Sequence, residues 1–354
     1  MFHVTDDVRI AGLRPLIPPA ILSEDLPVTA SAEVTVRGAR ARAADIIHGL
    51  DDRLLVIVGP CSVHDPASAL EYGERLRAEA DRLSDALVIF MRVYFEKPRT
   101  TIGWKGLIND PDIDDSYAIN KGLRLARQLL LDLAELGVPA GTEFLDTVIP
   151  QFLADLVSWS AIGARTAESQ GHRELASGLS MPVGFKNGTD GSIRIAIEAV
   201  QAAAHPHHFI GVTKQGIAAI VGTKGNRDCH IILRGAHAGP NFDRGSVADA
   251  AERLRTSGLG PRVLIDCSHG NSRKDPKNQP LVARDVASQV REGSGEVMGV
   301  MLESHLVEGN QAPAPTEALR YGQSITDACL GWNDTVRTLD ELAEAARARQ
   351  QRSR

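Results

Sequence analysis

The run Leu54-Leu55-Val56-Ile57-Val58, followed by Gly59-Pro60-Cys61-Ser62, carries the clearest fold signal in the chain. Five consecutive apolar residues predict a strand that is buried on both faces, as parallel strands are. An open doubly wound sheet would carry a glycine-rich dinucleotide turn directly after its first strand, and this turn has a different composition. The run therefore favours the closed alternative, an α/β fold of the (β/α)8 TIM-barrel type.

Similar apolar runs recur along the rest of the chain, and stretches with helical spacing separate them. In one such stretch, the apolar residues at positions 119, 123, 126, 130 and 133 fall on one helix face, with Asp115 as the expected N-cap and Gly137 as the expected stop. The expected barrel strands are Leu54–Val58, Leu87–Arg92, Val138–Glu143, Ser160–Gly163, Val183–Lys186, His230–Arg234, Val263–Asp266 and Val297–Glu303.

Two further apolar runs, Phe209–Thr213 and Ile217–Val221, exceed the eight strands of such a barrel. The short turn at residues 214–216 predicts that they pair as an inserted β-hairpin over residues 208–222. Residues 1–46 precede the strand pattern. We therefore expect an N-terminal extension over residues 1–46. The barrel is expected over residues 47–354, with the hairpin and a C-terminal helix included.

The composition excludes several classes of protein. The chain has 39 basic and 45 acidic residues. The resulting net charge of −6 argues against a nucleic-acid-binding protein. No apolar run approaches the ~20 residues that cross a bilayer, and the polar N-terminus does not resemble a secretory signal. The four cysteines are far apart, which argues against a disulfide framework. We expect a reduced, cytoplasmic protein without a membrane or nucleic-acid partner.

Six basic residues stand at or near the ends of the expected strands, the face where active sites of this fold lie. Their convergence in an acidic protein predicts anionic substrates, because guanidinium groups bind phosphate and carboxylate with paired hydrogen bonds. Backbone N–H groups around Ala164, ahead of an expected helix, offer a second anion-binding device. The alternative for each cation is an ion pair with a nearby carboxylate. The six are Arg92, Lys97, Arg99, Arg165, Lys186 and Arg234.

A divalent metal site is also available from residues near the strand ends. A thiolate, an imidazole and two carboxylates form a mixed donor set that suits Mn, Fe, Co or Zn. The spacing forms no local motif, and a free cysteine is equally a small buried hydrophobe, so both interpretations stay open on this ground alone. The four candidate ligands are Cys61, His269, Glu303 and Asp327.

The same residues lie in motifs that resemble class I 3-deoxy-D-arabino-heptulosonate 7-phosphate (DAHP) synthases, the microbial, feedback-regulated type. The resemblance covers nearly the whole chain. The motifs that carry it are Gly59-Pro-Cys-Ser-Val-His-Asp65, Met91-Arg-Val-Tyr-Phe-Glu-Lys-Pro-Arg-Thr-Thr101, Gly163-Ala-Arg-Thr166, Gly184-Phe-Lys-Asn-Gly-Thr189, Ile232-Leu-Arg-Gly235, Asp266-Cys-Ser-His269 and Glu303-Ser-His-Leu306.

The resemblance implies a (β/α)8 barrel and the first step of the shikimate pathway, in which phosphoenolpyruvate and erythrose 4-phosphate give DAHP and phosphate. It implies one divalent metal ion on Cys61, His269, Glu303 and Asp327. Lys97 would supply charge or a proton near the new alkoxide, and Glu143 would orient water. Arg99 and Thr100 would hold the sugar phosphate. Phosphoenolpyruvate would be bound by Arg92, Lys97, Ala164, Arg165, Lys186 and Arg234.

The resemblance also implies an aromatic amino acid inhibitor at a subunit interface of a homodimer or homotetramer. It makes residues 1–46 a regulatory or oligomerisation extension and residues 47–354 the catalytic barrel. Gly211 lacks a side chain and leaves room for a phenolic oxygen, which favours tyrosine as the inhibitor. Ordinary core and turn packing is the alternative for these positions. The residues that match the inhibitor site are Asp6, Asp7, Ile10, Pro150, Gln151, Leu179, Ser180, Phe209, Gly211 and Val221.

Two other functions compete with this one. A 3-deoxy-manno-octulosonate 8-phosphate synthase would use arabinose 5-phosphate, but the Lys97–Thr100 loop and the N-terminal extension argue against it. A catalytically silent barrel that senses an aromatic amino acid would be expected to lose some ligands and cations, whereas all are present here. A chorismate mutase partner is compatible with the sequence.

Overall fold

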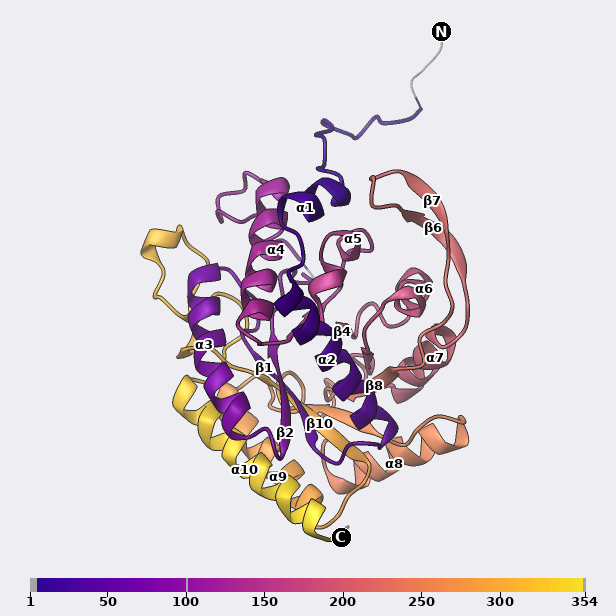
Figure 1. The fold of residues 1–354 in the computed structure, drawn as a ribbon, viewed down its shortest axis with the longest axis vertical. Helices are drawn as coiled ribbons and strands as arrows, with labels where there is room; N and C mark the ends of the chain where they lie inside the picture. Colours follow the sequence, from indigo (N-terminus) through magenta and orange to yellow (C-terminus); the bar gives the residue numbers. More distant parts are fainter. Residues whose placement is uncertain (1–4, 100, 353–354) are drawn as a thin grey trace.

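Eight parallel strands form a closed barrel in the computed structural model, which describes residues 5–99 and 101–352 (Figure 1). Strands that follow one another in the chain are neighbours in the sheet, and β1 closes the barrel against β10. The predicted architecture and all eight strands are confirmed, with ends that differ by at most two residues. The strands are β1 (Leu54–Gly59), β2 (Leu87–Arg92), β3 (Ala140–Glu143), β4 (Trp159–Ile162), β5 (Val183–Lys186), β8 (Cys229–Leu233), β9 (Val263–Asp266) and β10 (Val297–Glu303).

Helices follow the barrel strands and surround the sheet (Figure 1). Gly137, with φ of 80°, follows the end of α4 as predicted, but the predicted N-cap is wrong. Ala118 precedes the first helical turn, because Asp115 itself has a φ of 61° and lies in a turn. The helices are α3 (Pro66–Arg82), α4 (Ile119–Glu135), α5 (Pro150–Leu153), α6 (Gln170–Gly178), α7 (Ile193–Ala203), α8 (Arg244–Thr256), α9 (Gln279–Arg291) and α10 (Trp332–Arg352).

The N-terminal segment contains two helices, α1 (Pro19–Asp25) and α2 (Ala30–His48). The side chain of Arg40 in α2 donates to carbonyl oxygens just before β4, and Arg262, just before β9, donates to a carbonyl of α2. These contacts place α2 at the amino ends of the strands, opposite the expected site. The expected domain boundary between residues 46 and 47 falls inside this helix. Within the described residues, no helix has both the length and the apolar character that crossing a membrane requires.

The predicted hairpin is formed by β6 (His208–Val212) and β7 (Ala218–Gly222), which pair antiparallel between α7 and β8. It lies beside α6 and α7 on the outside of the barrel (Figure 1). A second small sheet follows β10 and pairs β11 (Val307–Asn310) with β12 (Gln323–Ser324). This sheet returns the chain to the barrel mouth and so carries Asp327 towards the ends of β1 and β10.

Candidate active site

A cavity of about 650 Å³ opens at the carboxyl ends of the barrel strands. It is lined by eleven of the residues predicted for catalysis or ligand binding, and Glu303 lies buried beside it. Thr100, which was predicted to bind the sugar phosphate, falls outside the described residues. The eleven are Cys61, Arg92, Lys97, Arg99, Glu143, Ala164, Arg165, Lys186, Arg234, His269 and Asp327.

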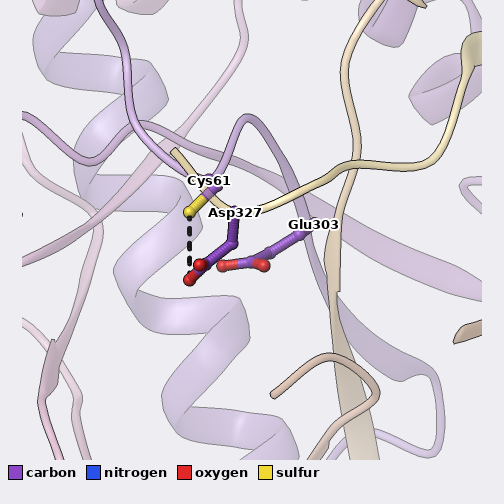
Figure 2. A group of neighbouring side chains, drawn as sticks. All are labelled: Cys61, Glu303 and Asp327. Carbon is purple, nitrogen blue, oxygen red and sulfur yellow. Dashed lines mark hydrogen bonds between the residues drawn. The ribbon is translucent and has the colours of Figure 1, made fainter. Parts of the chain in front are cut away.

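Three of the four predicted metal ligands converge. One ligand atom from each of Cys61, Glu303 and Asp327 lies within 4.8 Å of the others (Figure 2). Cys61 follows β1, Glu303 ends β10 and Asp327 follows β12, so three separate segments bring them together. A thiolate with two carboxylates suits a first-row divalent ion.

The fourth predicted ligand, His269, lies beside this group. Its Nε2 is 3.8 Å from Oε1 of Glu303, while its Nδ1 is 2.9 Å from Oδ2 of Asp266. The backbone at His269 has a φ of 54°, a region that a non-glycine residue rarely adopts. Such strain persists only where the surrounding structure fixes it, and here it directs the free ring nitrogen towards the acidic group.

Two cations balance the acidic group. Lys97 Nζ is 2.8 Å from Oδ2 of Asp327 and 3.1 Å from Sγ of Cys61, and Arg92 Nη2 donates to Glu303 Oε1 at 2.9 Å. Burial raises the pKa of the Cys61 thiol, and the charge of Glu303 adds to this effect. Burial acts to raise the pKa of Asp327, but the charge and hydrogen bond of Lys97 and the nearby His269 and Lys274 together outweigh it, and the net pKa is lowered.

Arg92 is buried, but not all of its N–H groups donate a hydrogen bond within the described residues. Its guanidinium carbon lies 3.5 Å from the centroid of the Tyr94 ring, and its Nε and Nη1 have no hydrogen-bond partner within the described residues. Leaving such donors unpaired costs about 1–3 kcal/mol each, so native proteins generally pair them. Both donors belong to a residue that lines the cavity, and an anion held there would satisfy them.

The other predicted cations divide into two groups. Lys186 is paired with buried Asp266, at 3.0 Å. Arg99, Arg165 and Arg234 form no ion pair within residues 5–99 and 101–352, although all three line the cavity. The ion-pair alternative thus accounts for Arg92, Lys97 and Lys186 only. Three guanidinium groups in the cavity wall are thus left without an ion pair in the described chain, which favours binding of a multiply charged anion.

The loop after β4 carries Ala164 into the cavity wall. Ala164 lies in a turn at the strand end, and α6 begins at Gln170, so the turn precedes a helix as expected. Anion binding by the backbone N–H groups of this turn stays a prediction. The turn has another role: a Cβ at Gly163 would lie 2.1 Å from Oε1 of Glu143, so the glycine leaves space for this carboxylate.

Two buried acids beside the cavity were missed by the sequence reasoning. Asp266 is fully buried at the end of β9. Glu96 accepts backbone hydrogen bonds from Leu145 and Asp146, and burial, with the charge of Asp146, raises its pKa to about 8. A charged residue that ends an apolar run was the available signal for Asp266. For Glu96 the sequence offers no comparable signal.

The residues predicted for inhibitor binding lie in three regions. Phe209 and Val221 are paired across the hairpin, and a Cβ at Gly211 would lie 2.7 Å from Cγ2 of Val221. Lys214 of the hairpin turn donates to the carbonyl of Gln151, which joins the hairpin to α5. Pro150 starts α5, and Leu179 and Ser180 follow α6. The remaining three, Asp6, Asp7 and Ile10, are exposed in the N-terminal segment, which extends away from the barrel (Figure 1).

Known proteins resemble the chain over nearly its whole length. The sequence profile of the DAHP synthetase I family matches residues 25–340. A Phe-sensitive phospho-2-dehydro-3-deoxyheptonate aldolase of Escherichia coli is 57% identical over 99% of both chains. A tyrosine-inhibited enzyme of the same name from Schizosaccharomyces pombe is 53% identical over 98% of this chain and 94% of its own. The solved structure of a phospho-2-dehydro-3-deoxyheptonate aldolase from Francisella tularensis superimposes with a TM-score of 0.94. It is 52% identical and covers 96% of this chain and 99% of its own.

Proposed function

The chain belongs to the DAHP synthetase I family, and we propose that it condenses phosphoenolpyruvate with erythrose 4-phosphate to give DAHP and phosphate. One observation carries this proposal: three metal-capable donors converge at the wall of a cavity that is also lined by cations without an ion pair in the described chain. Both substrates are phosphorylated, and phosphoenolpyruvate also carries a carboxylate. A cavity of about 650 Å³ that is lined by several guanidinium groups suits two such anions.

The donor set fits a divalent metal ion. Cys61, Glu303 and Asp327 present ligand atoms within 4.8 Å of one another, and His269 Nε2 lies 3.8 Å from Glu303. Manganese, iron, cobalt and zinc all suit this mixture of sulfur, nitrogen and oxygen ligands. A metal ion bound here would act as a Lewis acid towards the aldehyde of erythrose 4-phosphate.

Phosphoenolpyruvate would lie over the cations at the ends of β2, β5 and β8. Arg92 offers Nε and Nη1, which have no hydrogen-bond partner among the described residues, and Arg165 and Arg234 form no ion pair in that part of the chain. Lys186 and the backbone at Ala164 complete the proposed anion site. Guanidinium groups fix a planar carboxylate and a phosphate in one orientation, which presents C3 of phosphoenolpyruvate to the aldehyde carbon.

Lys97 is proposed to donate a proton during the reaction, and Glu143 is proposed to orient the attacking water. The new bond joins C3 of phosphoenolpyruvate to the aldehyde carbon, water adds at C2, and phosphate then leaves from C2. Lys97, held between Cys61 and Asp327, is placed to donate a proton to the forming alkoxide. Glu143 also lines the cavity and is proposed to orient the water, while Arg99 would hold the sugar phosphate.

Metal-stripped protein is expected to release phosphate from phosphoenolpyruvate only after Mn²⁺ and erythrose 4-phosphate are both added. Phosphate release, measured with each component omitted in turn, tests this. Arabinose 5-phosphate in place of erythrose 4-phosphate is the control for the related octulosonate reaction. Failure of folded, Mn²⁺-loaded protein to turn over either sugar phosphate would reject the proposal and favour a silent sensor.

An aromatic amino acid is proposed to inhibit the enzyme through the hairpin, α5 and the N-terminal segment of a second subunit. Ile210 and Ile220 lie opposite each other on the outer face of the hairpin and are 87% and 81% exposed. A homodimer or homotetramer would cover these side chains and bring another N-terminus to Phe209 and Gly211. The N-terminal residues of a single chain are exposed, so the site would need the partner.

Tyrosine is expected to inhibit at lower concentration than phenylalanine, because Gly211 leaves space for the phenolic oxygen. Inhibition curves for tyrosine, phenylalanine and tryptophan, taken at the same substrate concentrations, check this order. Gly211→Ser is the matched variant, since a side chain at this position would crowd Val221, narrow the space for the phenolic oxygen and reduce the preference for tyrosine. Stronger inhibition of the unmodified enzyme by phenylalanine would contradict the steric argument.

A further inference from the structure

We propose that Asp266 is a positioning residue for both halves of the site, orienting His269 towards the metal ion and holding Lys186 for the anionic substrate. The inference rests on the proposed function, because it concerns how that site is organised. Asp266 is the last residue of β9 and is fully buried. A buried carboxylate is costly unless it is paired, so its partners identify what it does.

The first partner is the imidazole of His269. Oδ2 of Asp266 lies 2.9 Å from Nδ1, and the hydroxyl of Ser268 lies 2.7 Å from the same nitrogen. Ser268 is in turn fixed, because its N–H and hydroxyl both donate to Oδ1 of Asp266. Nδ1 thus has its hydrogen-bond partner in the Ser268 hydroxyl and a charge contact with Oδ2, which accepts no hydrogen bond within the described residues, and this arrangement leaves Nε2 to act as a ligand.

The loop geometry supports this orientation. Three non-glycine residues of the loop after β9, His269, Arg273 and Lys274, have φ values between 54° and 62°. The N–H of Lys274 donates to the carbonyl of His269, and the Asn271 side chain donates to the carbonyl of Asp266. These contacts hold the strained backbone in place.

The second partner is the ammonium group of Lys186, whose Nζ lies 3.0 Å from the same oxygen, Oδ2. Lys186 is only 4% exposed and comes from β5, on the far side of β8 from β9. A flexible lysine side chain is held at one place in the cavity by this contact. One carboxylate oxygen thus joins a proposed metal ligand to a proposed phosphoenolpyruvate ligand.

Asp266→Asn retains the size of the side chain and removes its charge. Losing an outer-shell partner of a metal-bound histidine commonly costs about 10–100-fold in metal affinity, so the Kd for Mn²⁺ should rise by that factor. Electron paramagnetic resonance of free Mn²⁺ measures this Kd without turnover. Calorimetric titration of phosphoenolpyruvate into metal-free protein should show affinity several-fold weaker. The KM for erythrose 4-phosphate should stay within about twofold.

Three further variants make the test decisive. In a His269→Ala background, Asp266→Asn should no longer change the Mn²⁺ affinity, because the proposed effect passes through the imidazole. Ser268→Ala should weaken Mn²⁺ binding in the same direction, and it provides the test if Asp266→Asn does not fold. Asp249→Asn, at an exposed acid paired with Arg253 on α8, is the matched control and should change neither affinity.

Different outcomes would contradict the proposed function and the proposed role of Asp266. Failure of the unmodified protein to bind Mn²⁺ would overturn the proposed function itself. If the unmodified protein binds Mn²⁺ and Asp266→Asn binds it equally well, the role towards His269 is wrong. Unchanged or tighter binding of phosphoenolpyruvate by Asp266→Asn would overturn the role towards Lys186.

Discussion

Replacing Cys61 with alanine is expected to lower Mn²⁺-dependent phosphate release by about 100-fold or more. Outer-shell partners of metal ligands already cost about 10–100-fold when removed, and Cys61 is proposed to contact the ion directly. Its Sγ belongs to the converging group with Glu303 and Asp327, and it is the only sulfur among those three residues. Initial rates at saturating substrates and increasing Mn²⁺ concentrations measure the effect.

A spectroscopic measurement separates a ligand from a packing residue. Cobalt bound to the unmodified protein should show a thiolate-to-cobalt charge-transfer band, and Cys61→Ala should lack it. Cys229→Ala is the matched control, because Cys229 is also a buried thiol but lies in β8 outside the group. The ligand assignment fails if Cys61→Ala keeps the band, or if Cys229→Ala loses as much activity as Cys61→Ala.

The barrel was predictable because its signal is local and repeated. Each strand is buried on both faces, so each one reads as a short apolar run, and the turn after the first run excludes the dinucleotide alternative. Helix α2 was missed although its pattern is equally regular. Ala32, Val36, Ala39, Ala43 and Ile46 are buried at spacings of four, three, four and three. Most of them are alanines, which give a weaker hydrophobic signal than leucine or isoleucine.

The sequence predicted which residues belong to the site, but it did not predict how their side chains are arranged. Strand ends must converge in a closed barrel, so Arg92 and Lys186 were expected to share a cavity from topology alone. The position of Asp327 could not be predicted in this way, because it depends on the small sheet of β11 and β12. Which cations form ion pairs also depends on the directions of their side chains. The contact between Lys186 of β5 and Asp266 of β9 leaves no pattern in the sequence.

Replacing Lys97 with methionine is expected to separate metal binding from turnover. The ammonium group of Lys97 contacts Cys61 Sγ and Asp327 Oδ2, two of the atoms that would bind the metal ion. A cation at this place competes with a divalent ion for these donors. Removing it should therefore leave the Mn²⁺ affinity unchanged or make it higher, even though the site loses a charged residue.

Turnover should change in the opposite direction. Lys97→Met removes the ammonium group proposed to donate a proton to the alkoxide, and loss of a general acid typically costs about 10²–10⁴-fold in rate. Measuring kcat together with the Kd for Mn²⁺ by electron paramagnetic resonance gives both quantities on one protein. Methionine keeps an unbranched side chain of similar length, so packing against the cavity wall is largely retained.

Lys105→Met is the matched control, since Lys105 is exposed in the same loop and only its backbone carbonyl contacts Lys97. This variant should keep both kcat and Mn²⁺ affinity.

If Lys97→Met instead weakens Mn²⁺ binding as strongly as Cys61→Ala, Lys97 supports the metal ligands and does not compete with the ion. A Lys97→Met enzyme with unchanged kcat would show that the proton comes from elsewhere, and the proposed role of Lys97 would be wrong. Opposite shifts in affinity and rate are the result that a purely structural lysine would not produce.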